Sequence, residues 1–593
     1  MGLPEKNQPQ DPPFRVDFGT TFASVAFAHS SSPDEVKLVR TWLNARAGDE
    51  TADQVPSEVH YRNPITRGMT WGYEIPDDGA SQVLKWFKLL LQDQRDAPKA
   101  PQDRGSGQTK LDLAPVTTNP AQATAKALLE LGISPVKVIT DFLTRVRKVA
   151  LASIDSTYGR NLGGETRIEY VLTIPAIWSD MSKSLMVQAA QGAGFGTHRV
   201  DFVLMGEPES AAVYTLKELQ PDNLIVGDTC IICDAGGGTV DLISYQITAL
   251  NPLRLDEVVS GSGGMHGSVY LDHGFERYIR EKLGDDVIDS MKPRARKEMM
   301  RTWAENVKFK FGNTTTFAYD VSVHGVPDNE ATNVDDGEDV KRIFDPVVDR
   351  IVDLVTQQVQ GVQRKGFNVK AILLVGGFGS SAYLLQRLQN IHCGLQVLQP
   401  PNARTAIARG ALVRGLDGSI VKQKRSRRHY GCLSYTKYYP DLGWDAHAYW
   451  DSVEECWNVS GKLTWFLHKN DEVGDEMSTS FPFYRAYSEL PRRLVFTETL
   501  TACDSDAAPE FQWMDPTAIY SVCEVEADLS RIPREKFSRT TAPSGKSYYV
   551  VSYEIRMSLV ADVLRFEVVF EGRSQGIIKV RMKHPYHSPS FLE

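Results

Sequence analysis

The sequence is poor in cysteine, with 7 in 593 residues. A sparse and odd set of thiols argues against a disulfide-stabilised secreted domain and favours a reducing compartment. No uninterrupted apolar segment approaches the ~20 residues that a membrane-spanning helix needs. Residues 1–13 are polar and rich in Pro and Gln, and they lack the apolar segment of a secretory signal. We therefore expect residues 1–13 to form a disordered tail. We also expect a cytoplasmic location, with nuclear import as the alternative, and no membrane partner.

A strong charge of one sign is also lacking. The chain has 66 Lys and Arg residues against 75 Asp and Glu residues, and its net charge is −9. A mildly acidic chain does not have the overall basic character of a nucleic-acid-binding protein, so no nucleic-acid partner is expected. The 42% hydrophobic content is ordinary for globular proteins, and at this length it is enough for several hydrophobic cores.

Apolar residues follow two different patterns along the chain. Up to about residue 417, short β-branched segments alternate with longer helical ones, as at 170–174 before 181–192 and at 371–375 before 381–390. This alternation predicts α/β layers. Beyond residue 430, strand-like segments separated by turn residues predict a mostly β domain; they lie at 465–468, 478–483, 493–500, 548–557 and 566–570.

Two polar stretches interrupt these patterns. Residues 93–120 are rich in Gln, Asp, Pro, Gly and Thr, which is typical of an exposed insertion loop. Residues 418–429 gather Lys and Arg with no apolar pattern, and we expect them to form a solvated basic linker.

Two glycine turns carry the first chemical signal. In each, a strand that ends in Asp turns at Gly and Thr and returns as an alternating strand, with D-F-G-T-T at 17–21 and D-A-G-G-G-T at 234–239. Backbone N–H groups and hydroxyls of such a turn can hold a phosphate, and the aspartate can hold hydrated magnesium. Taken alone, the first turn is also compatible with an ordinary hairpin. Two such units far apart in one chain predict two lobes that hold one polyphosphate from opposite sides.

A third glycine turn, G-G-F-G-S-S-A at 376–382, leads from a strand into a helix. It also satisfies the G-x-G-x-x-A form of the dinucleotide-binding fingerprint. Residues 396–416 contain no acidic residue that could bind a ribose, which disfavours that alternative. The Walker sequence G-x-x-x-x-G-K-[ST] does not occur, which excludes an ordinary P-loop enzyme.

The three turns, in this order, resemble those of the actin, sugar-kinase and heat-shock ATPase superfamily, and the segments between them resemble the heat shock protein 70 family. These segments are T-I-P-A-I-W-S-D at 173–180, M-G-E-P-E-S-A-A at 205–212, W-A-E-N-V-K at 303–308 and A-I-A-R-G-A at 406–411. The segment H-G-S-V-Y-L-D at 266–272 is most similar to divergent fungal members and to the large divergent animal members. The resemblance covers residues 14–415.

The resemblance implies an actin-like nucleotide-binding domain at 14–417 built from two ribonuclease H-like lobes. We expect lobe I at 14–228 and 366–417, and lobe II at 229–365. The β-rich region at 430–593 resembles the family's peptide-binding β-sandwich. No long helical pattern follows its strands, so we expect no helical lid.

The resemblance also implies ATP or ADP with Mg²⁺ as ligands and gives roles to particular residues. Asp17 and Asp234 match aspartates that hold magnesium, mostly through water. The predicted catalytic residues have two roles. Lys88, Thr239 and Asp241 match groups that position or polarise the attacking water, and Glu207 matches a carboxylate near the metal. The predicted nucleotide contacts are Gly19, Thr20, Thr21, Gly236, Gly237, Gly238, Thr239, Glu305, Lys308, Gly376 and Gly377.

The chain departs from the family pattern around the adenosine. Phe309 and Gly312 stand where the family has Arg and Ser, and Phe378 and Ser380 stand where it has Ser and Arg. Loss of guanidinium stacking predicts weaker or altered base recognition. The basic run at 418–429 replaces the family's acidic linker, which predicts that nucleotide state does not control the second domain in the family's usual way.

The resemblance implies a slow, magnesium-dependent ATPase whose β domain binds unfolded peptides or client proteins, with co-chaperones as further partners. A nucleotide-dependent scaffold or switch with little hydrolysis is one alternative, favoured by the altered adenosine contacts. A small-molecule kinase of the same superfamily is another. We expect structural roles for Cys230 and Cys233 as buried thiols, for His266 as a loop residue, and for the Trp and Tyr residues of the β domain as its core.

Overall fold

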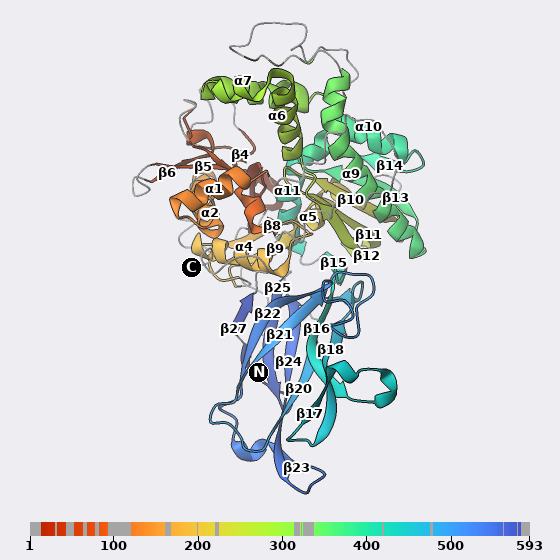
Figure 1. The fold of residues 1–593 in the computed structure, drawn as a ribbon. Coiled ribbons are helices and arrows are strands. Elements are labelled where there is room, and N and C mark those ends of the chain that lie inside the picture. The colour runs from red at the N-terminus through yellow and green to blue at the C-terminus, as the bar shows by residue number, and fades with distance from the viewer. Residues whose placement is uncertain are drawn as a thin grey trace. The chain divides into compact units, whose positions relative to one another are not determined.

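The computed structural model describes residues 13–29, 32–42, 52–62, 68–76, 82–92, 120–159, 168–198, 200–219, 224–312, 319, 321, 323, 337–417, 420–474, 478–560, 563–577 and 579–582. The chain forms two compact units, Met1–Val421 and Lys422–Glu593, which we call the α/β unit and the β unit (Figure 1). The predicted insertion loop, apart from Pro120, and the predicted N-terminal tail, apart from Pro13, lie outside the described residues.

The first sheet of the α/β unit has the strand order β3-β2-β1-β8-β9, and β4 also pairs with β2. The strands are β1 (Pro13–Phe18), β2 (Phe22–His29), β3 (Ser32–Leu38), β4 (Val55–Pro56), β8 (Glu169–Ile174) and β9 (Phe202–Gly206). β1, β2 and β3 form an antiparallel meander, whereas β8 and β9 continue the sheet in parallel from β1. The strands β5 (Glu58–Tyr61), β6 (Met69–Trp71) and β7 (Leu84–Lys85) form a separate small sheet of the α/β unit.

The second large sheet repeats the same strand order, β12-β11-β10-β13-β14, within the α/β unit. Its strands are β10 (Thr229–Ala235), β11 (Val240–Leu250), β12 (Leu253–Gly264), β13 (Val369–Val375) and β14 (Gln396–Leu398). Again the first three strands are antiparallel and the last two are parallel. Two sheets with the same topology agree with the predicted pair of ribonuclease H-like lobes. The glycine turns at 17–21 and 234–239 are both hairpins between antiparallel strands, as predicted.

The predicted assignment of residues 366–417 to the first lobe is wrong for most of that segment. β13 pairs in parallel with β10, and β14 pairs with β13, so both strands belong to the second sheet. Only α11 (Ala406–Asp417) returns to pack against β1, β2 and β8. The sequence could not show this, because local residue patterns do not specify which distant strand a parallel strand pairs with.

The helices of the α/β unit bury apolar stripes against these sheets. α2 (Pro135–Tyr158) begins at Ser134, whose side chain accepts from the N–H of Lys137, and it ends at Gly159 with φ +106°. The remaining helices are α1 (Gln122–Leu131), α4 (Asp180–Gly192), α5 (Glu207–Leu219), α6 (Val269–Leu283), α7 (Asp285–Ser290), α8 (Pro293–Thr302), α9 (Gly337–Arg364) and α10 (Ala382–Ile391). Among the described helices, none is long and apolar enough to cross a bilayer.

Strand β10 is buried on both faces, which explains its continuous apolar run. Ile231 and Cys233 pack into the core that includes α6 and α9, whereas Cys230 and Ile232 pack into the core that includes α5 and α11. The two thiols therefore face opposite sides of the sheet. Both cysteines are buried and unpaired by any disulfide, which confirms their predicted role as buried thiols and excludes a shared metal or redox site.

The β unit is a sandwich of two sheets, with the strand orders β17-β18-β16-β21-β22-β27 and β20-β24-β25-β26. The strands are β16 (His429–Lys437), β17 (Ala448–Asp451), β18 (Cys456–Leu467), β20 (Ser478–Tyr487), β21 (Val495–Cys503), β22 (Ile519–Asp528), β24 (Ser547–Val560), β25 (Val563–Phe570), β26 (Arg573–Ile577) and β27 (Lys579–Met582), and β23 (Ser538–Thr541) pairs with β24. Leu467, Leu500 and Val525 from one sheet meet Phe481, Tyr553 and Val568 from the other in the core. In the described part of this unit, the helical segments are short 3-10 turns, and no α-helix follows the strands.

The sequence predicted a solvated linker at 418–429, but its described residues, 420–429, are partly built into the β unit, and Lys422 and Gln423 are exposed. β15 (Val421–Arg425) pairs with β19 (Glu472–Val473), and Arg425 forms an ion pair with Glu472 at 3.0 Å. The Arg428 side chain is buried, and its Nη1 donates to the Tyr520 hydroxyl at 2.9 Å. These partners, Glu472 and Tyr520, lie far from the basic run in the sequence. The local sequence therefore indicated only an excess of positive charge.

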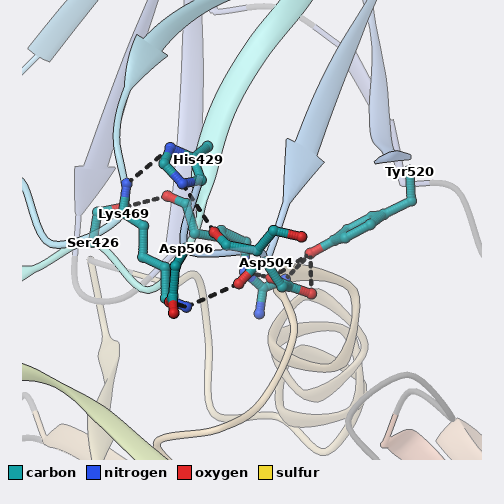
Figure 2. A network of polar contacts seen from close by, with 8 residues as sticks. Ser426, His429, Lys469, Asp504, Asp506 and Tyr520 are labelled. Carbon is teal, nitrogen blue, oxygen red and sulfur yellow. Dashed lines mark hydrogen bonds and ion pairs between the residues drawn. The ribbon is translucent and has the colours of Figure 1, made fainter. Parts of the chain in front are cut away.

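A polar network fixes the start of the β unit (Figure 2). Lys469 Nζ donates to Asp506 Oδ1 and to the carbonyl of Asp504, both at 2.9 Å. The ring of His429 lies between the N–H of Lys469 and the carbonyl of Ser505, at 3.2 and 3.1 Å. These bonds join the β16 end of the basic run to the loop that follows β21.

Candidate functional site

The first aspartate of the site is Asp17, at the end of β1. Its Oδ1 accepts from Thr173 at 2.9 Å, and its Oδ2 accepts from Ser24 at 3.3 Å. Burial, followed by the negative charge of Glu207, raises the pKa of Asp17 to about 7 from 3.8, against the opposing effect of Lys88. Thr173 and Ser24 are contacts that the motif analysis did not identify, since they come from strands on either side of β1.

The second element of the site is a buried ion pair. Lys88 lies in the 3-10 helix η3 (Phe87–Leu91), and its Nζ donates to Oε1 of Glu207 at 2.6 Å. Both side chains are almost fully buried, and the ammonium also lies 5.5 Å from the ring centroids of Phe18 and Trp178. Glu207 is the first residue of α5, where the helix dipole favours a negative charge.

The third element is the pair of aspartates on the β10–β11 hairpin. Asp234 and Asp241 are directly opposite each other in the ladder. Asp241 accepts from the N–H of Ile177 at 2.9 Å, which joins the hairpin to the segment after β8. Asp234 is 2% exposed, and its Oδ1 has no hydrogen-bond partner within the described part of the chain. Burial and the charges of Glu207, Asp241 and Asp17 raise the pKa of Asp234 well above 3.8.

The two glycine turns lie against each other. A Cβ atom at Gly237 would stand 2.6 Å from the Thr21 hydroxyl, and one at Gly238 would stand 2.5 Å from the Thr20 hydroxyl. Only residues without a side chain allow this approach. The predicted contacts Gly19, Thr20, Thr21, Gly236, Gly237, Gly238 and Thr239 are thus brought to one place, beside Asp17 and Asp234.

The carbonyls of the triple glycine loop are held by the start of α6. Ser268 N–H donates to Gly236 O at 3.1 Å, and Val269 N–H donates to Gly237 O at 2.9 Å. Because those carbonyls are occupied on the α6 side, the turn keeps a defined conformation. His266 precedes this contact, and burial lowers its pKa to about 4, so its imidazole is neutral near pH 7. It is partly buried among the loop residues.

The third turn approaches the same aspartate from another strand. Gly376 has φ +89°, and a Cβ atom there would stand 2.5 Å from Asp234 Oδ1. A larger residue would fill the space next to that unpaired oxygen. The turn continues through the 3-10 helix η6 (Phe378–Ser380) into α10, which confirms the predicted strand-to-helix turn.

The two predicted ribose contacts, Glu305 and Lys308, differ in their exposure to solvent. Glu305 and Lys308 lie on the π-helix η5 (Trp303–Lys308), and Glu305 is exposed to solvent. Lys308 is buried, and its Nζ donates to both carboxylate oxygens of Asp272 at 2.8 and 2.9 Å. Asp272 therefore neutralises Lys308, a contact that the sequence analysis did not predict.

Arg404 was missed by sequence reasoning. Its guanidinium carbon lies 4.5 Å from the ring centroid of Phe309, and its Nε donates to the Ser380 hydroxyl at 3.4 Å. Arg404 belongs to the 3-10 helix η7 (Ala403–Thr405) and has no carboxylate partner among the residues that the structure describes. Arg404 thus contacts both Phe309 and Ser380, the two positions at which this chain lacks the arginines of the family pattern. The sequence held no signal for this, because residue 404 lies outside the motifs.

A profile described as Hsp70 protein matches residues 110–423, which is more than half of the chain. The chain belongs to the Hsp70 family. It is similar to heat shock 70 kDa protein 12A of Homo sapiens, with 24% identity over 518 residues, covering 71% of this chain and 72% of that protein. It is also similar to the human 12B protein, with 24% identity over 530 residues and 74% of each chain. Chaperone protein DnaK of Thermoplasma volcanium is 23% identical over 294 residues, covering 48% of this chain and 44% of DnaK. These identities confirm a divergent member.

The buried charges of this Hsp70 chain suit a hydrated cation better than a directly ligated one. No group of three or more His, Cys, Asp or Glu side chains in the described ranges is arranged to hold a metal ion directly. Asp17, Asp234 and Asp241 are nevertheless buried with Glu207, and Lys88 is the cation that lowers the pKa values of Asp17 and Asp234. The unpaired Asp234 Oδ1 is a hard oxygen that can accept a hydrogen bond from magnesium-bound water.

Proposed function

We propose that this chain binds ATP with Mg²⁺ between its two glycine turns and hydrolyses it slowly. Membership of the Hsp70 family supports an ATP-binding function of the Hsp70 type. The observation that carries the proposal is the convergence of two Asp-Gly-Thr hairpins and one lysine on a single buried cluster. Such a cluster is costly in an empty protein, so its presence favours a charged ligand over a purely structural role.

In the proposed site, the side chains position the phosphates, the metal and the attacking water, and they form no covalent bond to the substrate. Loop N–H groups at 236–238 and the hydroxyls of Thr20 and Thr21 would hold phosphate oxygens. Asp17 and Asp234 would orient water around the metal, and Thr239 and Asp241 would orient the attacking water. Lys88, held by Glu207, would place positive charge beside the developing negative charge. Bound Mg²⁺ would supply neutralisation of the phosphate charge.

The adenosine would lie toward the third turn and η5. The backbone of Gly376 and Gly377 would pack against the adenosine, and Glu305 and Lys308 would contact the ribose. Phe309 and Arg404 would present a stacked ring and guanidinium to the base, in place of the two arginines of the family pattern. Because one arginine remains available from a different element, base recognition would be altered rather than absent.

The β unit is the proposed binding unit for extended peptides or client proteins, with co-chaperones as further partners. Its two-sheet sandwich and the Hsp70 relatives support this role. Without an α-helix after the described strands, a bound segment would be held without a latch and would dissociate readily.

Single-turnover hydrolysis of labelled ATP with Mg²⁺ tests the proposal. The wild-type chain is compared with Asp234→Asn and Thr239→Ala, and each protein is purified identically so that a contaminating ATPase would give the same rate in all three. We expect both variants to lower the rate by about 10-fold or more, as loss of a positioned polar group does. An unchanged rate in both variants would contradict the catalytic assignment, and absence of ATP binding by the wild type would contradict the whole proposal.

The second candidate is a nucleotide-dependent switch with little hydrolysis. It is favoured by the ion pair between Lys308 and Asp272 and by the replaced adenosine residues, which distinguish this site from the family pattern. Tight ATP binding with no measurable turnover in the same assay would select this candidate. Transfer of the phosphate to an added sugar or polyol would instead select the small-molecule kinase.

A further inference from the structure

The first residue of β16, His429, is enclosed by the loops that follow its two neighbouring strands. β16 lies between β18 and β21 in its sheet, so the loops after β18 and after β21 both reach this end of the strand. The His429 side chain is buried, and its ring lies 5.8 Å from that of Trp465, edge-to-face, measured between centroids. A titratable group is therefore held inside the β unit, away from the candidate nucleotide site.

The aromatic side chains of the β unit do not simply form its core, contrary to the prediction for its Trp and Tyr residues. Trp465 is half-buried, and Tyr449 and Tyr484 are 38% and 44% exposed. The core is built mainly from Phe, Val and Leu, together with Tyr430 and Tyr553. Strand alternation explains the error, because it decides which residues point outward, and composition alone cannot assign those positions.

The partners of the two ring nitrogens of His429 define one neutral form of the imidazole (Figure 2). Nδ1 faces the backbone N–H of Lys469 at 3.2 Å, and this group can only donate. Nε2 faces the carbonyl oxygen of Ser505 at 3.1 Å, and this oxygen can only accept. Nδ1 is therefore without a proton, and Nε2 carries one. A second proton on Nδ1 would set two donors against each other and break the bond to Lys469.

The charged side chains around His429 are paired with one another. Lys469 Nζ lies 2.9 Å from Asp506 Oδ1, on the two loops that enclose the ring. Arg428 Nε lies 3.5 Å from Asp504 Oδ1. An imidazolium would thus add a positive charge beside carboxylates that already have cationic partners. The other titratable side chains of these segments are His468, whose Nδ1 lies 3.3 Å from that of His429, and Asp471, Cys503 and Tyr520.

The same surroundings disfavour a charged ring at position 429. Burial lowers the pKa of His429 below 6.5, and the charges of His468 and Lys469 lower it further. Hydrogen bonds to the backbone of Ser505 and Asp506 oppose this shift. As pH falls, an unfolded chain takes up this proton before the folded β unit does. The free energy of unfolding of the β unit should therefore fall as pH drops below 6.5.

The loop that His429 anchors, residues 468–471, also holds the entry to the β unit. The N–H of Ser426 donates to the carbonyl of Asp471 at 2.9 Å, and the N–H of Asn470 donates to the carbonyl of Ser426 at 2.7 Å. β19 follows this loop directly and pairs with β15. The loop and β19 together therefore hold β15 and the turn after it.

We propose that His429 is an acid-sensitive clamp of the β unit. Protonation of its ring breaks the bond to Lys469, releases the loop at 468–471 from β16 and weakens the pairing of β15 with β19. The ordered entry to the β unit is thus a property of the neutral imidazole. Because the α/β unit ends and the β unit begins within β15, the regulated element is the connection between the two units. This inference does not depend on nucleotide or peptide binding.

Hydrogen–deuterium exchange of the full-length protein at about pH 7.5 and about pH 5.5, where ordinary carboxyl groups are ionised, tests the clamp. Protection factors, which correct for the intrinsic effect of pH on exchange, are compared for β15, β19 and the loop at 468–471. We expect this protection in the wild type to fall by about 3- to 10-fold at the lower pH, since a proton taken up on opening shifts the equilibrium by up to tenfold per pH unit below 6.5. In His429→Gln, which lacks the titrating ring, protection should not change between the two pH values.

The matched control is His447→Gln. It removes a histidine of the same unit whose ring stacks on Trp513 with centroids 4.4 Å apart, outside the clamp. This variant should keep the wild-type dependence on pH. Equal protection of the three segments at both pH values in the wild type would overturn the inference, and so would a dependence on pH that persists in His429→Gln.

Nitrogen NMR of the histidine rings keeps the inference testable if His429→Gln does not fold. In the wild type at about pH 7.5, the His429 ring should carry its proton on Nε2, and it should titrate with a midpoint below 6.5. A proton on Nδ1 at that pH, or a midpoint at or above 6.5, would contradict the clamp directly.

Discussion

Lys88 Nζ lies 2.6 Å from Glu207 Oε1, although the two residues are 119 positions apart in the chain. The pair joins a short 3-10 helix to the first turn of α5, and both side chains are almost fully buried. Their charges act on Asp17 and Asp234 in opposite directions, since Glu207 raises the pKa values of the two aspartates and Lys88 lowers them. Lys88 is thus a counter-charge within the cluster as well as the proposed catalytic lysine.

Removal of Lys88 alone should therefore destabilise the α/β unit. We expect Lys88→Met to lower the free energy of unfolding by about 3–5 kcal/mol, because Glu207 would remain buried without its partner. The double variant Lys88→Met with Glu207→Gln should recover much of that loss. Urea unfolding of both variants measures the effect. The control is Lys137→Met, whose exposed ion pair with Asp141 should contribute no more than about 1 kcal/mol.

The aspartates predict an unusual dependence of stability on pH. A carboxyl whose pKa is raised in the folded state keeps its proton when the unfolded chain has already lost it. For Asp17 this holds between 3.8 and about 7, so the free energy of unfolding should fall as pH rises through that range. The same sign applies to Asp234, whose pKa is also raised.

Asp234→Asn should consequently stabilise the nucleotide-free protein at pH 7.5 while it slows hydrolysis. We expect the melting temperature of the α/β unit to rise by about 1 °C for each kcal/mol gained, because the entropy of unfolding grows with chain length, and the difference from wild type to shrink at pH 5. Differential scanning calorimetry at several pH values measures both effects. A variant less stable than wild type at pH 7.5 would show that the Asp234 carboxylate is not destabilising in the empty site.

Arg404 should affect the base but not the phosphates. Arg404→Ala removes the guanidinium over Phe309, and we expect a loss of ATP affinity of about 3- to 30-fold, the range of a cation–π contact. Affinity for tripolyphosphate, which has no base, should not change. Isothermal titration with both ligands makes the comparison. Phe309→Leu should give the same pattern, and an equal loss for both ligands would place Arg404 at the phosphates instead.

Two glycines of the site should differ sharply in their tolerance of a methyl group. A Cβ atom at Gly267 would stand 2.6 Å from the carbonyl carbon of Gly238, whereas one at Gly377 would meet no atom within 4 Å. We expect Gly267→Ala to lower stability by about 1–3 kcal/mol through overpacking against backbone. Gly377→Ala should fold normally. Thermal unfolding of the two variants measures this, and equal stability would contradict the packing of α6 on the glycine loop.

Local features of the site followed from the sequence. The Asp-Gly-Thr hairpins at 17–21 and 234–239 and the strand-to-helix turn at 376–382 were predicted correctly, because turn residues and strand periodicity act over a few positions. The Hsp70 family and the α/β-then-β organisation followed from the order of such motifs along the chain. The roles of the individual site residues remain predictions.

Contacts between distant segments were decided only by the tertiary structure. The pairing of β13 with β10, the meeting of Arg404 with Phe309 and the burial of Arg428 each join residues far apart in the chain. The exposure of Tyr449 and Tyr484 likewise depends on which face of a strand meets the other sheet. By itself the sparse cysteine content excluded a disulfide framework, and the motifs determined the family. Which charges are neutralised, and which are left for a ligand, depends on packing that brings together partners from distant parts of the chain.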